Sequence, residues 1–223
     1  MSKISLEPNA SGAGTFTLAA PNSNTNRTLT LPDESGTIFS DGTGVPGSAV
    51  TGQLASSNMP TGSVIQVMQT IKTDVFSATV NAGDSTAVTG LSVNITPSSS
   101  NSKILVMTSV SASQSNNRTS SSSPGFTFIR LKRNSTNLGL GDSGGSYQVT
   151  AGIAGITALD NYTARVPNTS SHTFLDSPST TSQITYQVEV GQTRGADNLF
   201  YVNRSNDDRG RASSTITVVE IAG

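Results

Sequence analysis

The chain of 223 residues contains no cysteine, no tryptophan and a single histidine, and it carries little charge of either sign. Without cysteine it can form no disulfide, thiolate metal site or cysteine nucleophile. Its 13 Lys and Arg and 14 Asp and Glu give a net charge of −1, whereas nucleic-acid binding requires many cations to displace counterions from phosphates. Its longest apolar runs are a few residues, against the roughly 20 that cross a bilayer. We expect no nucleic-acid partner and no membrane insertion.

Small polar residues take up the chain instead. The 36 Ser, 30 Thr, 17 Asn, 21 Gly and 9 Pro account for about half of it, and only 33% of the residues are hydrophobic. Disorder of the whole chain would also require a high net charge, which is missing. The first residues, MSKISLEPNASG, lack the apolar segment of a signal peptide, and extracellular domains commonly depend on disulfides. This combination is typical of an assembly that is made in the cytoplasm and used outside the cell.

The sequence predicts an all-β fold. Helical periodicity is nearly absent, and short β-rich runs bounded by Ser, Asn, Gly and Pro recur. The clearest run, 184–190, has apolar residues at every second position, which predicts a strand with one face on a core and one in water. Similar runs predict strands at 64–70, 75–80, 87–96, 125–133, 146–153, 199–204 and 214–222. Their number and spacing favour a β-sandwich or a jelly roll.

Segment 102–110 differs from the other strands because both of its faces are apolar. Ile104, Val106 and Val110 alternate with Leu105 and Met107. A strand of this pattern is buried on both sides. We expect it to lie either between two sheets or at a contact between subunits.

The chain divides into three zones. Residues 1–39 repeat short strands that end in Pro or Gly, and we expect an attachment or shaft segment there. Residues 1–62 hold only 19 hydrophobic residues, six of them Ala, too few to offset about 1–2 kcal/mol of backbone entropy per ordered residue, so these strands must pair, most simply with sister chains. Residues 40–63 form a Gly/Ser-rich connector, either a flexible linker or a thin stalk. Residues 64–223 are long enough for one knob domain with a β-sandwich or jelly-roll core.

Several motifs of the chain resemble those of phage fibre proteins, especially from marine phages. FTLAAP at 16–21, followed by TLTLPDESGTI at 28–38, resembles the N-terminal region of such fibres. Other motifs together resemble a recurrent C-terminal domain of phage tail fibres and related virion fibres; they are GLSVNITPSSSNSKILVMTSV at 90–110, FTFIRLKRNST at 126–136, LGLGDSGGS at 138–146, FLDSP at 174–178 and SSTITVVEIAG at 213–223.

The resemblance implies a homotrimeric virion protein that is made in the host cytoplasm. It also implies that the N-terminal segment docks on other virion proteins and that the C-terminal domain forms a β-rich knob. Fibres of this kind usually carry much longer shafts, and this chain departs from that pattern. A mounting place on the tail, the baseplate or the head is therefore left open.

The single histidine, His172, is a weak candidate for chemistry. It stands between serine and threonine, whose side chains would point to the opposite face of a strand, and no G-x-S-x-G elbow surrounds it. A Ser–His–Asp triad and a metal bound by three copies of His172 on a trimer axis are both possible on paper. The favoured interpretation is a surface or loop histidine.

A glycosidase would need two acids about 5–10 Å apart. The candidates mostly stand beside Gly, Ser or Asn, where Asp makes local turn hydrogen bonds; they are Asp142, Asp160, Asp176, Asp197, Asp207 and Asp208. Asp207 and Asp208 are interpreted first as a solvated turn, and their surroundings do not match a calcium-binding loop. We expect no enzyme activity, no metal and no cofactor.

Receptor contacts are expected in polar loops, because loops on a rigid β scaffold commonly carry binding. The candidate loops are 114–124, 161–172 and 205–212. The predicted receptor-binding residues are Gln114, Asn116, Asn117 and Arg118, which would hydrogen-bond sugar hydroxyls, and Tyr162, which would stack on a sugar face.

A small basic cluster closes the strand expected at 125–133. Arg130, Lys132 and Arg133 are interpreted, in order of preference, as charges that keep a sheet edge from aggregating, as a subunit ion pair, or as a contact for acidic glycans. The function favoured by the sequence is a short trimeric fibre that attaches a phage to a host surface glycan or envelope protein. The alternatives are an architectural protein of the head or tail without a receptor and, less favoured, a glycan depolymerase.

Overall fold

A computed structural model describes residues 11–15, 17, 22, 24–26, 28, 54–114, 127–142, 167–192, 198–205 and 208–223. The chain divides into two compact units, Met1–Gly52 and Gln53–Gly223. In the first unit only scattered positions in turns, bends and irregular backbone are described, so the repeat strands expected within 1–39 lie largely outside the described residues. The strand expected at 146–153 and residues 40–53 of the connector also lie outside them.

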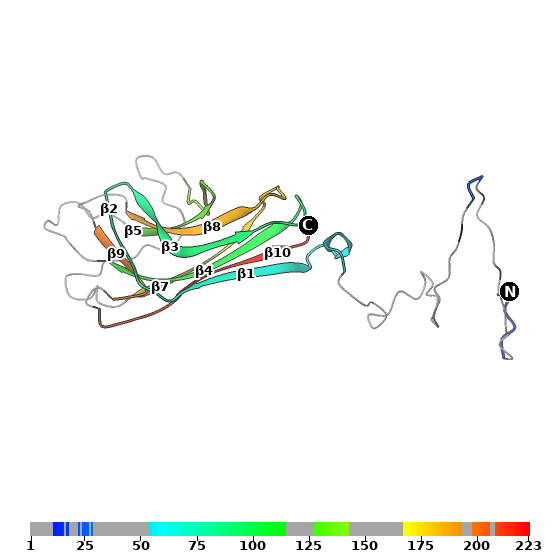
Figure 1. Cartoon of the computed structure of the whole chain (residues 1–223), viewed down its shortest axis with the longest axis horizontal. Helices are drawn as coiled ribbons and strands as arrows, with labels where there is room; N and C mark the ends of the chain where they lie inside the picture. Colours follow the sequence, from blue (N-terminus) through cyan, green and yellow to red (C-terminus); the bar gives the residue numbers. More distant parts are fainter. Residues whose placement is uncertain are drawn as a thin grey trace. The chain divides into compact units, whose positions relative to one another are not determined.

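The second unit is all-β and antiparallel across its described residues (Figure 1). One 3-10 turn, Ser56–Asn58, precedes the strands. The strands are β1 (Val64–Lys72), β2 (Phe76–Val80), β3 (Ser85–Ile95), β4 (Lys103–Gln114), β5 (Thr127–Arg133), β6 (Thr136–Leu138), β7 (Asn168–Asp176), β8 (Ile184–Gln192), β9 (Asn198–Val202) and β10 (Ser214–Ile221).

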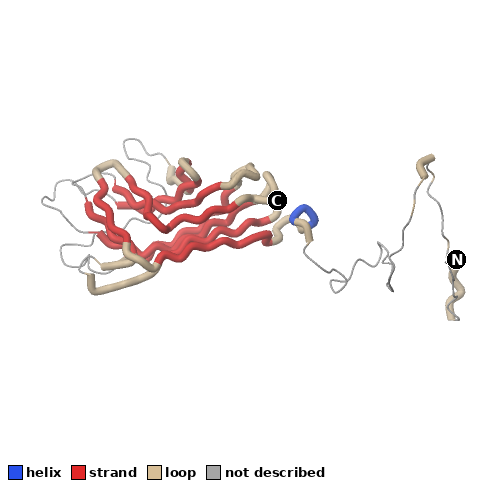
Figure 2. The backbone as a smooth tube through the Cα atoms, viewed as in Figure 1, coloured by secondary structure: helices blue, strands red, loops and turns tan. Residues whose placement is uncertain are grey.

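The strands form two sheets that lie one above the other (Figures 1 and 2). Sheet A has the order β1-β10-β4-β9-β2, with β7 pairing to β4, and sheet B has the order β3-β8-β5-β6. A single hydrophobic core lies between them, with side chains from both sheets such as Val106 and Val218 of sheet A and Ile129 and Val188 of sheet B. Burying these apolar side chains against each other is the main favourable term for the fold.

Alternation along the strands explains which residues reach the core. In β8, Ile184, Tyr186, Val188 and Val190 are all buried, as the sequence predicts. The strands expected at 64–70, 75–80, 87–96, 102–110, 125–133, 199–204 and 214–222 are confirmed with small shifts of their ends. Two strands are not among those expected: β6 is three residues long, and β7 has the polar sequence NTSSHTFLD, which gives little hydrophobic signal.

The expectation that β4 is buried on both faces is only half right for the described chain. Ile104 and Val106 face the core and are fully buried, but Met107 on the opposite face is 37% exposed. The second face of β4 belongs to the outer surface of sheet A, because that sheet packs on sheet B from one side only. Burial of β4 between two sheets is therefore wrong, and the other alternative, a contact between subunits, stays a prediction.

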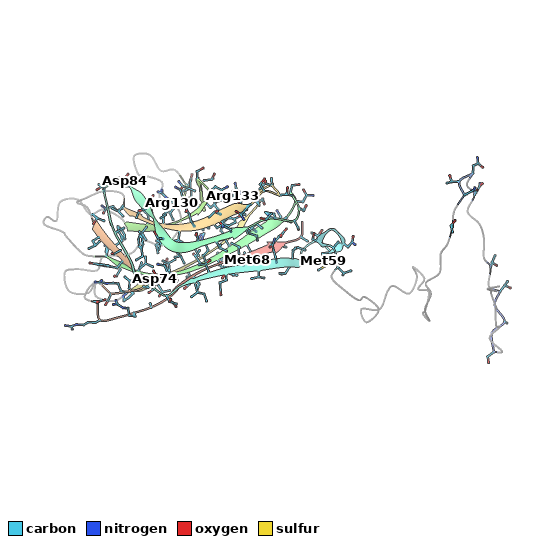
Figure 3. The ribbon with its side chains drawn as sticks, in the orientation of Figure 1. Met59, Met68, Asp74, Asp84, Arg130 and Arg133 are labelled. Carbon is cyan, nitrogen blue, oxygen red and sulfur yellow. The ribbon has the colours of Figure 1, made fainter. Side chains whose placement is uncertain are left out.

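The two ends of the sandwich have different connections. At one end, the backbone N–H of Gly62 donates to the carbonyl oxygen of Ala222 at 2.8 Å, and Ala222 N–H donates to Ser63 at 2.9 Å. The chain therefore enters the second unit beside its own C-terminal strand, at what we call the connector end. Figure 3 places Met59 near this end and Asp74 and Asp84 at the opposite end, which we call the distal end.

Candidate functional site

The strand ends that flank the expected receptor loops meet at the distal end. Gln114, at the end of β4, pairs with Phe200 of β9. Thr127, which begins β5, pairs with Gln192, which ends β8, and Asn168, which begins β7, pairs with Ala112. The antiparallel register therefore brings Gln114, Thr127, Asn168 and Gln192 to the same end of the sandwich.

Of the predicted receptor-binding residues, the structure describes Gln114. Its side chain is buried, with 5% of its surface exposed, and Oε1 has no hydrogen-bond partner among the described residues. A direct sugar contact by Gln114 would require its surroundings to open. Asn116, Asn117, Arg118 and Tyr162 lie outside the described residues, and their roles stay predictions.

A described part of the distal end is the hairpin between β9 and β10, which we call the distal hairpin (residues 203–213). It starts at Asn203, a fully buried residue with a left-handed backbone, φ +65°. The Asn203 amide donates to the carbonyl oxygens of Lys72 at 2.8 Å and Asp74 at 3.0 Å, and Oδ1 accepts from Ser214 Oγ at 2.6 Å. These bonds tie the hairpin to the β1–β2 turn and to β10.

Ser205 holds the distal hairpin in shape. Its hydroxyl oxygen accepts hydrogen bonds from the backbone N–H groups of Arg209 at 2.9 Å and Gly210 at 2.8 Å. Its own N–H donates to the Gly210 carbonyl at 3.0 Å, and its carbonyl accepts from Asp208 at 3.1 Å. The backbone of the hairpin is thus fixed by internal hydrogen bonds, as in a Ser-centred turn.

Charged and aromatic groups line the described part of this hairpin. Arg204 lies over the ring of Tyr201, with its guanidinium carbon 4.3 Å from the ring centre, a cation–π contact. Asp208 pairs with Arg204 at 3.5 Å and with Arg211. The expectation of a solvated turn holds for Asp208, since both Asp208 and Arg211 are exposed. A pre-shaped hairpin with guanidinium groups suits recognition of a carboxylate or sulfate on a glycan.

The loop expected at 161–172 is partly wrong. Residues from Asn168 onward belong to β7, which pairs with β4 from Asn168 to Asp176. The reason is tertiary, because β4 provides a long apolar strand on which this polar segment completes the sheet. The binding segment proposed there is therefore shortened to 161–167, and of these only Pro167 is described.

His172 lies within β7, so its interpretation as a loop histidine is wrong, and it is only partly exposed. Its ring is half-buried and stacks on Phe174, with centroids 6.4 Å apart. Burial lowers the pKa of His172 below its ordinary value. Its Nδ1 atom has no partner in the described chain, and neither has the hydroxyl of Thr108, which is directly opposite on β4. The histidine therefore lies on the face of β7 that carries Phe174.

One of the expected acids, Asp176, has a structural role. It is buried and comes from sheet A, while Arg133 and Tyr186 reach it from sheet B. Arg133 Nη1 donates to both carboxylate oxygens at 2.8 Å, and the Tyr186 hydroxyl donates to Oδ2 at 2.6 Å. A buried carboxylate needs such partners. Asp176 therefore links the two sheets across one end of the core.

The basic cluster of β5 makes ion pairs within the chain. Lys132 lies 3.0 Å and Arg130 3.8 Å from the buried carboxylate of Glu189 on β8, and Arg133 pairs with Asp176 at 2.8 Å. β6 pairs with β5 at Leu131, Lys132 and Arg133, so the edge-protecting interpretation is wrong for Lys132 and Arg133. For Arg130, which pairs with β8 alone among the described strands, that interpretation stays a prediction. Cross-strand pairing with Glu189, which the sequence could not register, explains two of its three cations.

Two of the other expected acids, Asp142 and Asp208, are among the described residues. Asp142 is exposed after β6, Asp208 is in the distal hairpin, and Asp160, Asp197 and Asp207 lie outside the described residues. Within the described ranges no three His, Cys, Asp or Glu side chains come together as metal ligands would. The same part of the chain contains no helix of the length and apolarity that crossing a bilayer requires.

No protein-family model matches the chain, and no curated protein matches it.

Proposed function

We propose that the chain is a structural virion protein, a short trimeric phage fibre whose knob attaches to the host cell surface. The observation that carries this proposal is the separation of the two ends of the sandwich. The chain enters beside Ala222 at the connector end, and the flanks of all three candidate loops lie at the distal end. A domain held at one end presents its polar loops at the other, as an adhesive knob must.

The second support is chemical. The distal hairpin presents Arg209 and Arg211 at exposed positions, and Ser205 fixes its backbone. Guanidinium groups suit a carboxylate or sulfate on an acidic glycan. Weak single contacts repeated in a trimer would gain avidity of about a hundredfold or more. In this proposal the N-terminal segment docks on another virion protein, and the protein resides in the virion after synthesis in the host cytoplasm.

We propose that the protein adheres to its receptor without catalysing a reaction. The described acids Asp176 and Asp208 are engaged in ion pairs with arginines, which disfavours their use as a general acid and base. A purely architectural role on the head or tail is the second candidate. It is favoured by the burial of Gln114, because a receptor contact at that position would have to disturb the fold.

Binding to host cells and to purified host envelope glycans tests the proposal. Replacing Asn116, Asn117 and Arg118 together by Ala, or Arg209 and Arg211 together by Ala, should leave the fold intact and weaken adsorption. A matched control replaces the exposed connector-end residues Thr181 and Gln183 by Ala, which should leave adsorption unchanged. Retention of glycans without cleavage supports the adhesin. Release of reducing sugars would establish a depolymerase instead, and absence of binding by the unaltered protein would favour the architectural role.

A further inference from the structure

The outer face of sheet A carries an unusual amount of exposed apolar surface. Register places Val67 of β1 opposite Val219 of β10, Val219 opposite Leu105 of β4, and Leu105 opposite Leu175 of β7. These four side chains form one apolar row across β1, β10, β4 and β7. Figure 1 shows these strands in the lower layer. Further apolar side chains extend the row into a patch, the apolar face of sheet A; they are Val64, Ile71, Met107 and Ile221.

The exposure of this patch is large. Val64 and Ile71 are each 57% exposed, Val67 is 56% and Leu175 is 51%. The corresponding outer face of sheet B is polar, with Thr185 and Gln187 on β8. Only a third of the residues are hydrophobic, so the composition did not force apolar side chains onto one outer surface. A concentrated apolar patch on a polar protein marks an interaction surface.

We infer that copies of this chain cover the apolar face of sheet A. The area of this face suits a contact between subunits. Four strands about 4.8 Å apart, each presenting about nine residues at about 3.3 Å, give a flat area of about 570 Å². A standard protein interface buries about 800 Å² of the more uneven accessible surface on each partner. The face therefore offers an area of the order that one partner buries in a standard interface.

The low charge of this face also favours another copy of the chain as its partner. Lys103 is the one charged side chain in the described rows of this face, and it lies beside Ile221 at the connector end, donating to Ser177 at 3.3 Å. Two or three copies of the face can meet without placing like charges opposite each other. A nucleic acid or an anionic lipid surface would need basic groups there. A self-complementary apolar surface with Thr and Ser around it suits another copy of itself.

The pattern of β4 supports the same inference. Its inner face, with Ile104 and Val106, belongs to the core, and its outer face, with Leu105 and Met107, lies in the centre of the patch. A strand apolar on both faces is expected only where both faces become buried. Subunit contact completes that burial. The apolar face of sheet A would thus be the contact between subunits of the proposed trimer. Only the number of copies rests on the proposed function.

The test uses the full-length chain at micromolar concentration. Light scattering coupled to size exclusion should give an oligomer for the unaltered protein. Val67→Asp combined with Leu175→Asp should reduce the mass to that of one chain, 22.9 kDa, with the β circular dichroism retained. Ser92→Asp, which adds one negative charge at an exposed position of β3 on sheet B, is the control and should stay oligomeric.

A second measurement covers the case in which the double variant fails to fold. Because the chain has no cysteine, Leu175→Cys and Ser92→Cys each introduce a single thiol. In the folded protein, maleimide should modify the thiol at position 175 at least about tenfold more slowly than at position 92, since opening must come first. Equal rates, an unaltered protein that is monomeric, or a double variant of unchanged mass would each overturn the inference. Adsorption is measured separately, so an oligomer that does not adsorb removes the proposed function and leaves this interface.

Discussion

The phenolic oxygen of Tyr186 lies 2.6 Å from Oδ2 of Asp176 and donates a hydrogen bond to it, although the two residues come from different sheets. Burial and then this bond raise the pKa of Tyr186 above its ordinary value. Arg133 neutralises the same carboxylate. The three side chains form a polar link between the two sheets, and a link of this kind fixes how the sheets register.

The link predicts unequal effects of its members. Asp176→Ala leaves Arg133 and Tyr186 without their partner and should lower the free energy of unfolding by about 3–5 kcal/mol. Tyr186→Phe removes one donor and keeps the ion pair, so about 1–2 kcal/mol is expected. Urea unfolding followed by circular dichroism measures both. Equal losses would show that the hydroxyl rather than the ion pair holds the sheets together.

Neighbouring residues of β4 should separate folding from assembly. Val106→Asp places an unpaired carboxylate in the core at several kcal/mol, comparable with the 5–15 kcal/mol stability of a typical domain, so the protein should not fold. Leu105→Asp adds the charge one residue away, on the apolar face of sheet A. That variant should retain its β circular dichroism and lose its self-association. A folded Val106→Asp would contradict the assignment of the two faces.

Part of the pH dependence of stability is expected to come from the titration of Glu220. Burial would raise the pKa of this fully buried carboxyl, but hydrogen bonds from Gln66 at 2.6 Å and from Ser98 N–H at 2.7 Å outweigh it and hold the pKa below 4.5. Ionised Glu220 therefore stabilises the fold above pH 4.5, and this contribution is lost as the pH falls through the lower folded-state value.

The variant Glu220→Gln isolates this effect. The difference in unfolding free energy between the unaltered protein and the variant should be constant above about pH 5 and shrink at lower pH. Urea midpoints measured from pH 7 to pH 3 would establish it. A difference that does not change with pH would mean that Glu220 titrates alike in the folded and unfolded chain.

Truncation of Asn203 to Ala is expected to lower the stability of the fold strongly. Asn203→Ala removes the donor to Lys72 and Asp74 and the acceptor of Ser214, and each buried group left unpaired costs about 1–3 kcal/mol. Ser179→Ala is the matched control, because Ser179 has a similar left-handed backbone, φ +52°, but is exposed. The melting temperature should fall much further for Asn203→Ala. Similar falls would mean that backbone strain alone explains both.

Gly191 of β8 leaves no room for a side chain. A Cβ atom there would lie 2.4 Å from Phe128 Cζ and 2.8 Å from the Asp84 carbonyl oxygen. Gly191→Ala should therefore lower stability by about 1–3 kcal/mol, because Phe128 and the Asp84 backbone must both move. Gly191→Ala combined with Phe128→Leu should recover part of the loss, as measured by thermal unfolding. Full stability of the single variant would contradict this packing.

The candidate site was predictable only in outline. Polar turns between alternating strands indicated which segments are loops, but Gln114 extends β4 and is buried, and residues 168–172 pair with β4. Nothing in NTSSHTFLD signals a strand by itself, because its apolar content is too low to define a buried face. Similarly, the partners of Arg130 and Lys132 could not be predicted, since Glu189 comes beside them only through the register of β5 and β8.

The sequence by itself determined that the chain forms antiparallel β-structure, because alternation along each strand is a local property that survives any arrangement of the sheets. It also indicated the apolar character of both faces of β4. Only the tertiary structure decided what each face meets, since Val106 points toward sheet B and Leu105 joins Val67 and Leu175, residues far apart in the chain. Strand order and register are set by the sum of long-range contacts, and those contacts also bring Asp176 to Tyr186 and place His172 in a strand paired to β4.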